Sequence, residues 1–597
     1  MLRKTTLISV ILFAVSFSAK SVIRVNQVGY LPEDIKAAVY LGDTHPEKLI
    51  FEITLPDGSK INADSIVSYR PWEPAQASAR VYFTSADKKG TYKLTARDKS
   101  GKIADSAEFY IGKDAYSRLK LNELPLYYLR QQRCGYNPIH QAECHIHDGI
   151  VVLSDSLEGQ HFDVTGGWHD ASDYLQYLPT SANTVYQMLF AYREYPDVWG
   201  DEFDALGNKG ANGVPDILDE ARWGLEWMQK MNPRDGIYFN QIADDRDHRF
   251  AGVPQRDTVD YDFGPGGARP VYPVSGEPYG LREYKNRSNG EASSVAKFAS
   301  AFALGSSVFA DIDPDFATDL AVRSRKAYDY ALAHPGASQT ACCVSPYFYE
   351  EENWVDDVEL AAAALHRLQG RSSDFSKARA FASAERFTLW MGADTARHYQ
   401  WYPFVNLGHY EASKADTRGE FASYYREGLE RVAKRGADNV FISGIPYVWC
   451  SNNFTTALVT QAMLYKEMTG DDSFAELETA ARDWLFGVNP WGQTMIIMPE
   501  GTVESSPMDP HSAMSNLEID GTPGRDFLIG GLVDGPVYTN IFNSLRGVHL
   551  RNDDRFSQFQ NPMVVYHDDY SDYSTNEPTM DGTAALTYML ARLCKEK

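Results

Sequence analysis

The spacing of apolar residues changes once along this 597-residue chain, near residue 113. From about residue 20 to residue 112, short runs such as KAAVYLGD and GTYKLTARD are rich in β-branched and aromatic residues and lie between turns such as Asp-Gly and Lys-Gly. Short runs of this kind are typical of the strands of an antiparallel sandwich. We therefore predict a small all-β domain over residues 20–112.

Beyond a connection near residues 113–117, the spacing becomes helical. In DILDEARWGLEWMQKM, four apolar residues fall on one face of a helix: Leu218, Ala221, Leu225 and Met228. Comparable segments recur as far as DGTAALTYMLARLCK, separated by long loops rich in glycine, proline, aspartate and aromatic residues. The series predicts a large all-α domain over residues 118–597, with function carried by its loops.

The first 20 residues, MLRKTTLISVILFAVSFSAK, combine Arg3 and Lys4 with an apolar stretch that is followed by Ser18 and Ala19. This order is typical of a secretory signal peptide, here residues 1–19. A membrane anchor is the weaker interpretation, because the apolar stretch is shorter than the roughly 20 residues that a bilayer span needs. We expect a secreted protein, extracellular or periplasmic, with no membrane partner.

The composition narrows the range of partners. The formal net charge is −24 at pH 7, whereas nucleic acids and anionic membranes attract clusters of Lys and Arg. Aromatic residues make up 13% of the chain, with 36 Tyr and 11 Trp, which leaves rings for a binding surface as well as a core. We expect a monomer that binds no nucleic acid and needs no organic cofactor.

Two acidic segments stand near opposite ends of the helical region. GGWHDASDYLQY places Asp170 and Asp173 three residues apart, and HDDYSDYSTNEPTMDG places Glu577 just before a helical segment. Hydrolysis of a glycosidic bond needs one protonated carboxyl group and one ionised carboxylate. Asp170 or Asp173 could equally cap a helix, since aspartate is a common N-cap. The three residues would serve hydrolysis if the fold brings them across one cleft.

Both acidic segments resemble the signature motifs of glycoside hydrolase family 9. GGWHDASDYLQY is similar to the family's Gly-Gly-Trp-(His or Tyr)-Asp-Ala-Gly-Asp motif and DYSTNE to its second motif, while VWCSNN and FGVNPWGQTMI resemble two segments between them. The opening IRVNQVGYLPED resembles the start of the immunoglobulin-like module that precedes many of these catalytic domains. The resemblance implies an (α/α)6 barrel preceded by an immunoglobulin-like β-sandwich.

The resemblance also implies roles for the three carboxyl groups. Asp173 would be the general base that deprotonates the attacking water, Asp170 would help hold that water, and Glu577 would be the general acid. The family inverts configuration, so the acid and the base should lie about 6.5–9.5 Å apart.

Four side chains are expected to contact the substrate: Trp168, Trp449, His511 and Tyr573. The chain departs from the family motifs at two places. Ser172 replaces a glycine, and DPHSAMS keeps His511 but has Ala513 where the family has an arginine that binds sugar.

The segment RCGYNPIHQAECHIHDG offers a set of metal ligands. From spacing alone, Cys134 and Cys144 could equally form a disulfide. The resemblance favours a structural zinc held by Cys134, Cys144 and His145, with His169 as the fourth ligand and His161 as the alternative.

A calcium site is a further expectation. EENWVDDVEL carries oxygen donors at the start of a helix, namely Glu351, Asn353, Asp356 and Asp357, and oxygen ligands suit calcium. The segment resembles a calcium-binding segment of the family, but the helix dipole explains acidic residues at this position as well.

These features together predict a secreted endo-β-1,4-glucanase that acts on cellulose or related β-glucans. The alternative within the same fold is an exo-acting hydrolase of cello-oligosaccharides or glucosamine oligomers. A non-catalytic polysaccharide-binding protein is disfavoured, because Asp170, Asp173 and Glu577 are all present.

Overall fold

The structure, a computed structural model, describes residues 21–342 and 349–595. The predicted signal peptide, residues 1–19, therefore lies outside the described residues. Within the described ranges, no helix is both long enough and apolar enough to cross a bilayer.

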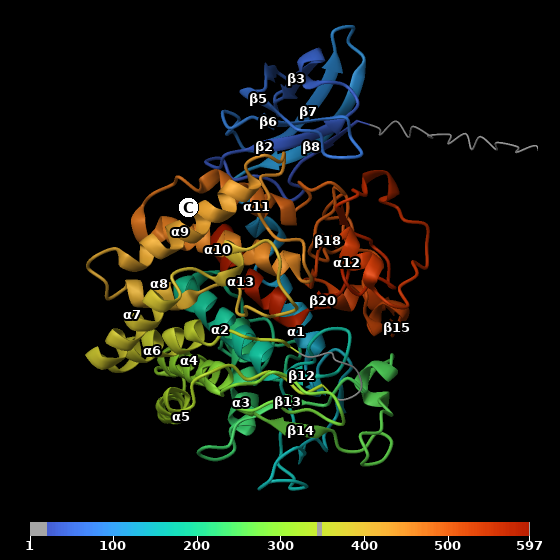
Figure 1. Cartoon of the computed structure of the whole chain (residues 1–597). Helices are drawn as coiled ribbons and strands as arrows, with labels where there is room; N and C mark the ends of the chain where they lie inside the picture. The colour runs from blue at the N-terminus through green and yellow to red at the C-terminus, as the bar shows by residue number, and fades with distance from the viewer. Residues whose placement is uncertain (1–20, 343–348, 596–597) are drawn as a thin grey trace, which may run out of the picture.

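The N-terminal domain is a sandwich of two four-stranded antiparallel sheets, drawn in blue at the top of Figure 1. In sheet order, the first contains β1 (Val22–Arg24), β2 (Ala37–Gly42), β6 (Ala77–Tyr82) and β5 (Ser65–Tyr69). The second contains β4 (Lys60–Asn62), β3 (Leu49–Thr54), β7 (Gly90–Asp98) and β8 (Ile103–Ile111). Tyr30, Phe83 and Phe109 fill the space between the sheets with edge-to-face and tilted ring contacts. The prediction of an all-β sandwich is confirmed.

Six helices of the second domain form a closed inner ring in which each helix contacts the next and the last contacts the first. They are α2 (Leu178–Glu194), α4 (Ala292–Phe309), α6 (Val355–Gln369), α8 (Leu407–Ser413), α10 (Ser451–Thr469) and α13 (Met580–Cys594). Most residues of α2, α4, α10 and α13 are buried on every side. Helices that are apolar or small-residue-rich all round must be covered all round, which is why a second layer exists.

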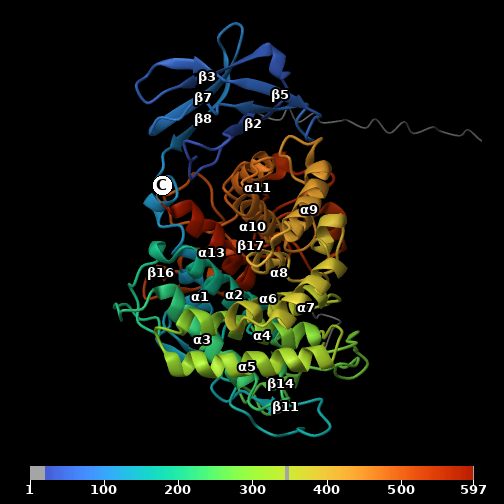
Figure 2. The ribbon, with the colours of Figure 1, turned by 90° about the vertical axis from the view of Figure 1, so that its left-hand side faces the viewer.

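Six outer helices supply that layer, each packed against one or two of the inner helices (Figure 2). They are α1 (Leu124–Gln132), α3 (Asp216–Met231), α5 (Pro314–Ala333), α7 (Ser372–Ala384), α9 (Glu420–Gly436) and α11 (Ala475–Leu485). The architecture is the expected (α/α)6 barrel. The short α12 (Thr539–Ser544) lies outside both rings.

Short strands in the connecting loops fix the two acidic segments. β12 (Gln176–Tyr177) joins a sheet with β13 (Phe239–Ile242), β14 (Pro270–Pro273) and β11 (Ile150–Val151), and it runs directly into α2. β20 (Pro578–Thr579) pairs with β17 (Leu532–Val533) and runs directly into α13. Because α2 and α13 are neighbours in the inner ring, the segments that precede them meet at one end of the barrel.

Other short strands brace the remaining loops in antiparallel pairs. The pairs are β9 (Gly135–Asn137) with β10 (Ala142–Cys144), β15 (Glu518–Ile519) with β16 (Thr522–Pro523), and β18 (Val537–Tyr538) with β19 (Val564–Val565).

The unusual string NQVGY forms part of the contact between the two domains. Asn26 Nδ2 donates to Asp483 Oδ1 at 2.8 Å, and the Gln27 backbone N–H donates to the Phe486 carbonyl at 3.0 Å. Arg24 Nη2 donates to the Pro490 carbonyl at 2.8 Å. The string therefore has a structural role, since it ties the sandwich to the loop that follows α11.

We expect Asn26→Ala to destabilise the protein by about 1–3 kcal/mol, because Asp483 Oδ1 would lose one of its donors and the buried N–H groups of Val28 and Gly29 would lose their acceptor. Asn26 is fully buried. The urea midpoint of the variant should fall relative to wild type, whereas Asn62→Ala, at an exposed position of β4, should leave it unchanged. Equal midpoints for all three proteins would contradict this account of the domain contact.

Candidate active site

The two acidic segments are joined by direct hydrogen bonds at the end of the barrel. The backbone N–H of Ser172 donates to Glu577 Oε1 at 3.0 Å, and the Ser172 hydroxyl donates to the same oxygen. The Met580 N–H donates to the backbone carbonyl of Asp170 at 2.9 Å. The fold thus brings Asp170, Asp173 and Glu577 together, and the departure from the motif at Ser172 positions the glutamate.

Asp170 is held rigidly in a nearly dry setting. Its Oδ1 accepts from Thr180 Oγ1 at 2.7 Å, and its Oδ2 accepts from the Tyr349 hydroxyl. Its side chain is only 2% exposed. Burial, followed by the charges of Asp173 and Asp581, raises the pKa of Asp170 well above its ordinary range. Both oxygens have fixed donors, so the side chain suits an orienting role better than proton transfer.

Asp173 lies at the edge of the same cluster. Its Oδ1 accepts from the Leu175 N–H at 2.9 Å. Burial raises the pKa of Asp173 to about 7; His248 opposes this shift, and Asp247 and Glu577 add to it. A base whose pKa lies near neutrality can accept a proton from water at working pH and release it afterwards.

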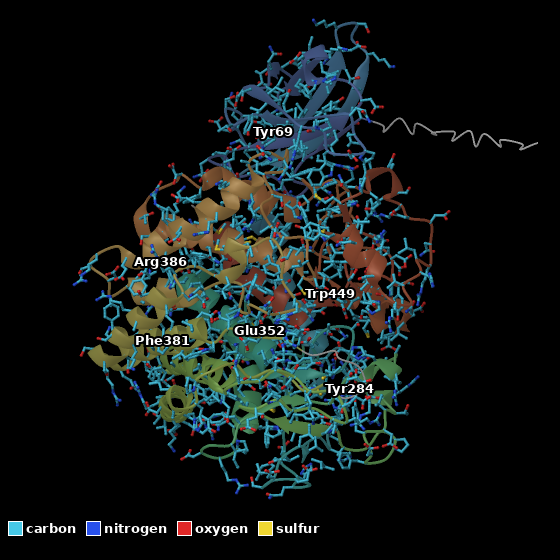
Figure 3. All side chains as sticks on the ribbon, in the orientation of Figure 1. Tyr69, Tyr284, Glu352, Phe381, Arg386 and Trp449 are labelled. Carbon is cyan, nitrogen blue, oxygen red and sulfur yellow. The ribbon has the colours of Figure 1, made fainter. Side chains whose placement is uncertain are left out.

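Aromatic side chains stand beside the carboxyl groups. Trp449, labelled in Figure 3, lies between His398 and Tyr573, with ring centroids 5.6 Å and 5.5 Å away. His511 contacts Tyr573 with a centroid distance of 5.9 Å, and its Nδ1 donates to the Tyr570 carbonyl at 2.5 Å. Trp449 and Tyr573 are both partly exposed. Three of the four expected substrate contacts therefore form one surface.

Trp168 does not belong to that surface, and the prediction that it contacts substrate is wrong. Its side chain is fully buried, and its indole N–H donates to Glu220 Oε1 at 2.8 Å. Glu220 in turn pairs with Arg133 at 2.9 Å. The motif fixes Trp168 next to the loop of residues 169–175, which carries Asp170 and Asp173, but turns it into the core against α3.

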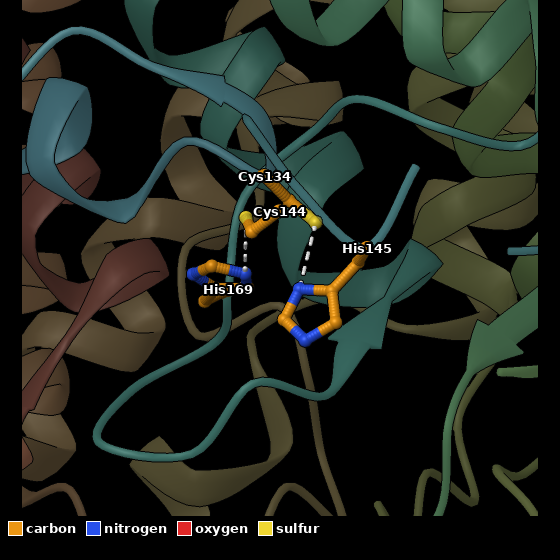
Figure 4. Close-up of side chains that lie close together, drawn as sticks. All are labelled: Cys134, Cys144, His145 and His169. Atoms are coloured by element: carbon orange, nitrogen blue, oxygen red, sulfur yellow. Dashed lines mark hydrogen bonds between the residues drawn. The ribbon is translucent and has the colours of Figure 1, made fainter. Parts of the chain in front are cut away.

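The expected metal ligands form a compact buried cluster (Figure 4). One ligand atom from each of Cys134, Cys144, His145 and His169 lies within 4.8 Å of the others. Cys134 Sγ and His145 Nδ1 are 3.6 Å apart, and Cys144 Sγ and His169 Nε2 are 3.9 Å apart. Two thiols and two imidazoles around a tetrahedral zinc would stand about 3.5 Å apart, so the donor set fits that ion.

The surroundings of the cluster also fit a metal. His145 Nε2 lies 3.2 Å from Asp257 Oδ2, the arrangement that orients many metal-bound histidines. Both thiols are free, so the alternative disulfide is not formed. His161 is exposed and its ring faces the His147 carbonyl at 3.2 Å, which excludes it as the fourth ligand. His169 directly precedes Asp170, and the cluster is therefore tied to the loop that carries Asp170 and Asp173.

The expected calcium donors also come together, but a lysine stands among them. Lys297 Nζ lies 2.5 Å from Glu351 Oε1 and 2.8 Å from Asp357 Oδ2. Asn353 turns its amide NH₂ toward Asp356 Oδ1 at 2.6 Å, as a donor. An ammonium group stands between the carboxyl groups where a calcium ion would have to bind, so these residues do not fit a calcium ion as arranged.

Several residues of the site carry no sequence signal. Tyr349 lies in a loop, His248 lies in the short 3-10 helix Asp247–Arg249, and Thr180 has the sequence pattern of an ordinary helix residue. The one signal was at Ser172, where the chain departs from the motif.

Comparison with known proteins agrees with this geometry. Residues 120–590 match the family model "Glycosyl hydrolase family 9", and residues 18–100 match "Cellulase N-terminal ig-like domain". The chain belongs to glycosyl hydrolase family 9. The resemblance stated from the motifs is confirmed.

Among related sequences, Endoglucanase C of Cellulomonas fimi is 26% identical; the match covers 95% of this chain and 51% of that protein, about half its length. Cellodextrinase of Butyrivibrio fibrisolvens is 23% identical, with 95% of this chain and 98% of that protein covered. Among solved structures, a metagenome-derived family 9 endoglucanase has a TM-score of 0.69 at 26% identity, covering 96% of this chain and 99% of that one. A zinc-binding triple mutant of endoglucanase J30 has a TM-score of 0.71 at 23% identity, covering 95% and 100%, and supports the fold.

We expect the melting temperature of the wild-type protein to be the same with EGTA and with added calcium, because the ammonium group of Lys297 already occupies the position between Glu351 and Asp357. Lys297→Met should cost about 3–5 kcal/mol, since it leaves buried carboxylates unpaired. Lys377→Met, at an exposed position of α7, is the matched control. A wild-type melting temperature that falls in EGTA would show that the site binds calcium after all.

Proposed function

We propose that this family 9 hydrolase is an inverting endo-β-1,4-glucanase acting on cellulose or related β-glucans. The observation that carries the proposal is the junction of Asp170, Asp173 and Glu577 beside the partly exposed rings of Trp449 and Tyr573. Aromatic faces suit the apolar faces of a glucan chain, and paired carboxyl groups suit its hydrolysis.

The proposed step is a single displacement. Glu577 gives its proton to the leaving glycosidic oxygen as the bond from that oxygen to the anomeric carbon breaks. A water oriented by Asp170 attacks the anomeric carbon from the opposite face, and Asp173 takes the proton that this water loses. Glu577 then regains a proton from solvent and Asp173 releases one, which restores both groups.

Exo-acting cleavage is the second candidate for the mode of action. Relatives of this chain include proteins named endoglucanase and one named cellodextrinase, and Ala513 stands where the family has a sugar-binding arginine. These observations support exo-acting hydrolysis of cello-oligosaccharides or glucosamine oligomers as the alternative.

We also propose that the cluster of Cys134, Cys144, His145 and His169 holds a structural zinc, and that the protein is exported. A bound zinc would cross-link the loop after α1 to the catalytic loop. Two thiolates and two imidazoles complete its coordination, so the ion would take no part in chemistry. The apolar N-terminal segment supports export.

For the metal, we expect one zinc per chain by elemental analysis. Cys144→Ser should lose the zinc and lower the melting temperature, because a closed four-ligand site contributes folding energy. His161→Ala should keep it. Wild-type protein purified without zinc and unchanged in stability by added zinc would contradict the proposal.

For the activity, we expect purified mature protein to reduce the viscosity of soluble β-1,4-glucan steeply while few reducing ends form. Glu577→Gln should lose about 10²–10⁴-fold in rate, the usual contribution of a general acid. Glu518→Gln, at an exposed position, should not. Reducing ends without a fall in viscosity would favour exo action, and an active Glu577→Gln variant would refute the assignment.

A further inference from the structure

A carboxyl group outside the predicted site stands directly beside the proposed general acid. β17 and β20 run antiparallel with Val533 opposite Pro578. One residue further, the Asp534 N–H donates to the Glu577 carbonyl at 2.9 Å. Directly opposed residues of an antiparallel pair project to the same face with Cβ atoms about 5 Å apart. The backbone register therefore fixes the side chains of Asp534 and Glu577 as neighbours.

The carboxyl group of Asp534 lacks both the solvent and the hydrogen-bond donors that usually stabilise a negative charge. Its side chain is fully buried, and neither carboxyl oxygen has a hydrogen-bond partner of standard geometry. The Cys450 thiol and the Trp449 ring lie close enough to lower its pKa, but burial and then the charge of Glu577 raise it much further. An ionised carboxylate in such a place costs several kcal/mol, so Asp534 and Glu577 cannot both be ionised at low cost.

We propose that Asp534 is a positioning residue for the acid step, which with Glu577 forms a carboxyl pair that retains one proton at neutral pH. The proposal rests on the proposed function of Glu577. In such a pair the proton belongs to the two groups jointly. Asp534 is buried and Glu577 is partly exposed. Glu577 is therefore the member of the pair that faces the substrate, and Asp534 is the inner member that can hold the shared proton.

The carboxyl pair explains how the proposed acid can keep its proton at a pH at which the proposed base has lost its own. Ser172 directs two donors at Glu577 Oε1, so this oxygen acts as an acceptor and the proton that Glu577 donates must be held on its other oxygen or on its neighbour. The base Asp173 is ionised only above a pH of about 7, so the acid must keep its proton above that pH. A second carboxyl group beside Glu577 supplies that retention.

Other titratable groups face the pair from the surrounding elements. They are Tyr128 of α1, Asp173 of the catalytic loop, His248, Cys450 before α10, Tyr573 and, toward Asp534, Asp581 of α13. His248 is the one basic side chain among these groups of the described chain, and it also faces Asp173 and Asp247.

The test is the pH dependence of kcat/KM on soluble β-1,4-glucan for wild type and Asp534→Asn, which removes the charge but keeps the shape. We expect the alkaline limb of the variant to move down by at least one pH unit, which is a tenfold or greater loss at pH values well above the wild-type limb. The acid limb, set by Asp173, should stay near pH 7. Asp526→Asn, a partly exposed acid before β17, should leave both limbs unchanged.

A second substrate separates an acid-step defect from a structural one. 2,4-Dinitrophenyl β-cellobioside has a leaving group that needs no proton, so Asp534→Asn should hydrolyse it at the wild-type rate. Equal losses on both substrates, or an unmoved alkaline limb, would overturn the proposal. A wild-type alkaline limb below pH 7 would overturn it without any variant. Retained glucanase activity in Glu577→Gln would instead refute the proposed function.

Discussion

The active site depends on the closure of the inner ring of helices. α13 packs against α2, although nearly 400 residues separate them along the chain, as the hydrogen bond from Thr587 Oγ1 to the Gln187 carbonyl illustrates. Each of these helices begins directly after a short strand, and each strand follows one acidic segment. Loss of the contact between α2 and α13 would separate the proposed base from the proposed acid.

The buried carboxyl groups of this protein fall into two groups, those paired with a lysine or arginine and those with no lysine or arginine among their nearest charges. At the start of α6, Glu351 and Asp357 are paired with the ammonium group of Lys297, which makes that region a structural one. At the end of the barrel, Asp173 and Asp534 are buried without a lysine or arginine partner among their nearest charges. Burial without a lysine or arginine partner raises the pKa of these carboxyl groups, and a hydrolase that moves protons needs this property.

Much of the fold followed from the sequence because it depends on local periodicity and on short linear motifs. Asp170, Asp173 and Glu577 were found because their neighbours form recognisable strings. Trp168 was misassigned, because a motif does not tell which way a ring turns when its loop meets α3. Lys297 was missed, since its partners lie more than 50 residues away. Asp534 belongs to none of the recognised motifs. Its position beside Glu577 follows only from the register of β17 with β20.

The central claim is that Asp173 and Glu577 hydrolyse a β-linkage in one inverting displacement. Proton NMR of the first product formed from a β-1,4-linked oligosaccharide, recorded before the anomers equilibrate, tests it most directly. The account predicts that the new reducing end appears first as the α-anomer. Initial release of the β-anomer would require a covalent intermediate and would contradict the roles given to both residues.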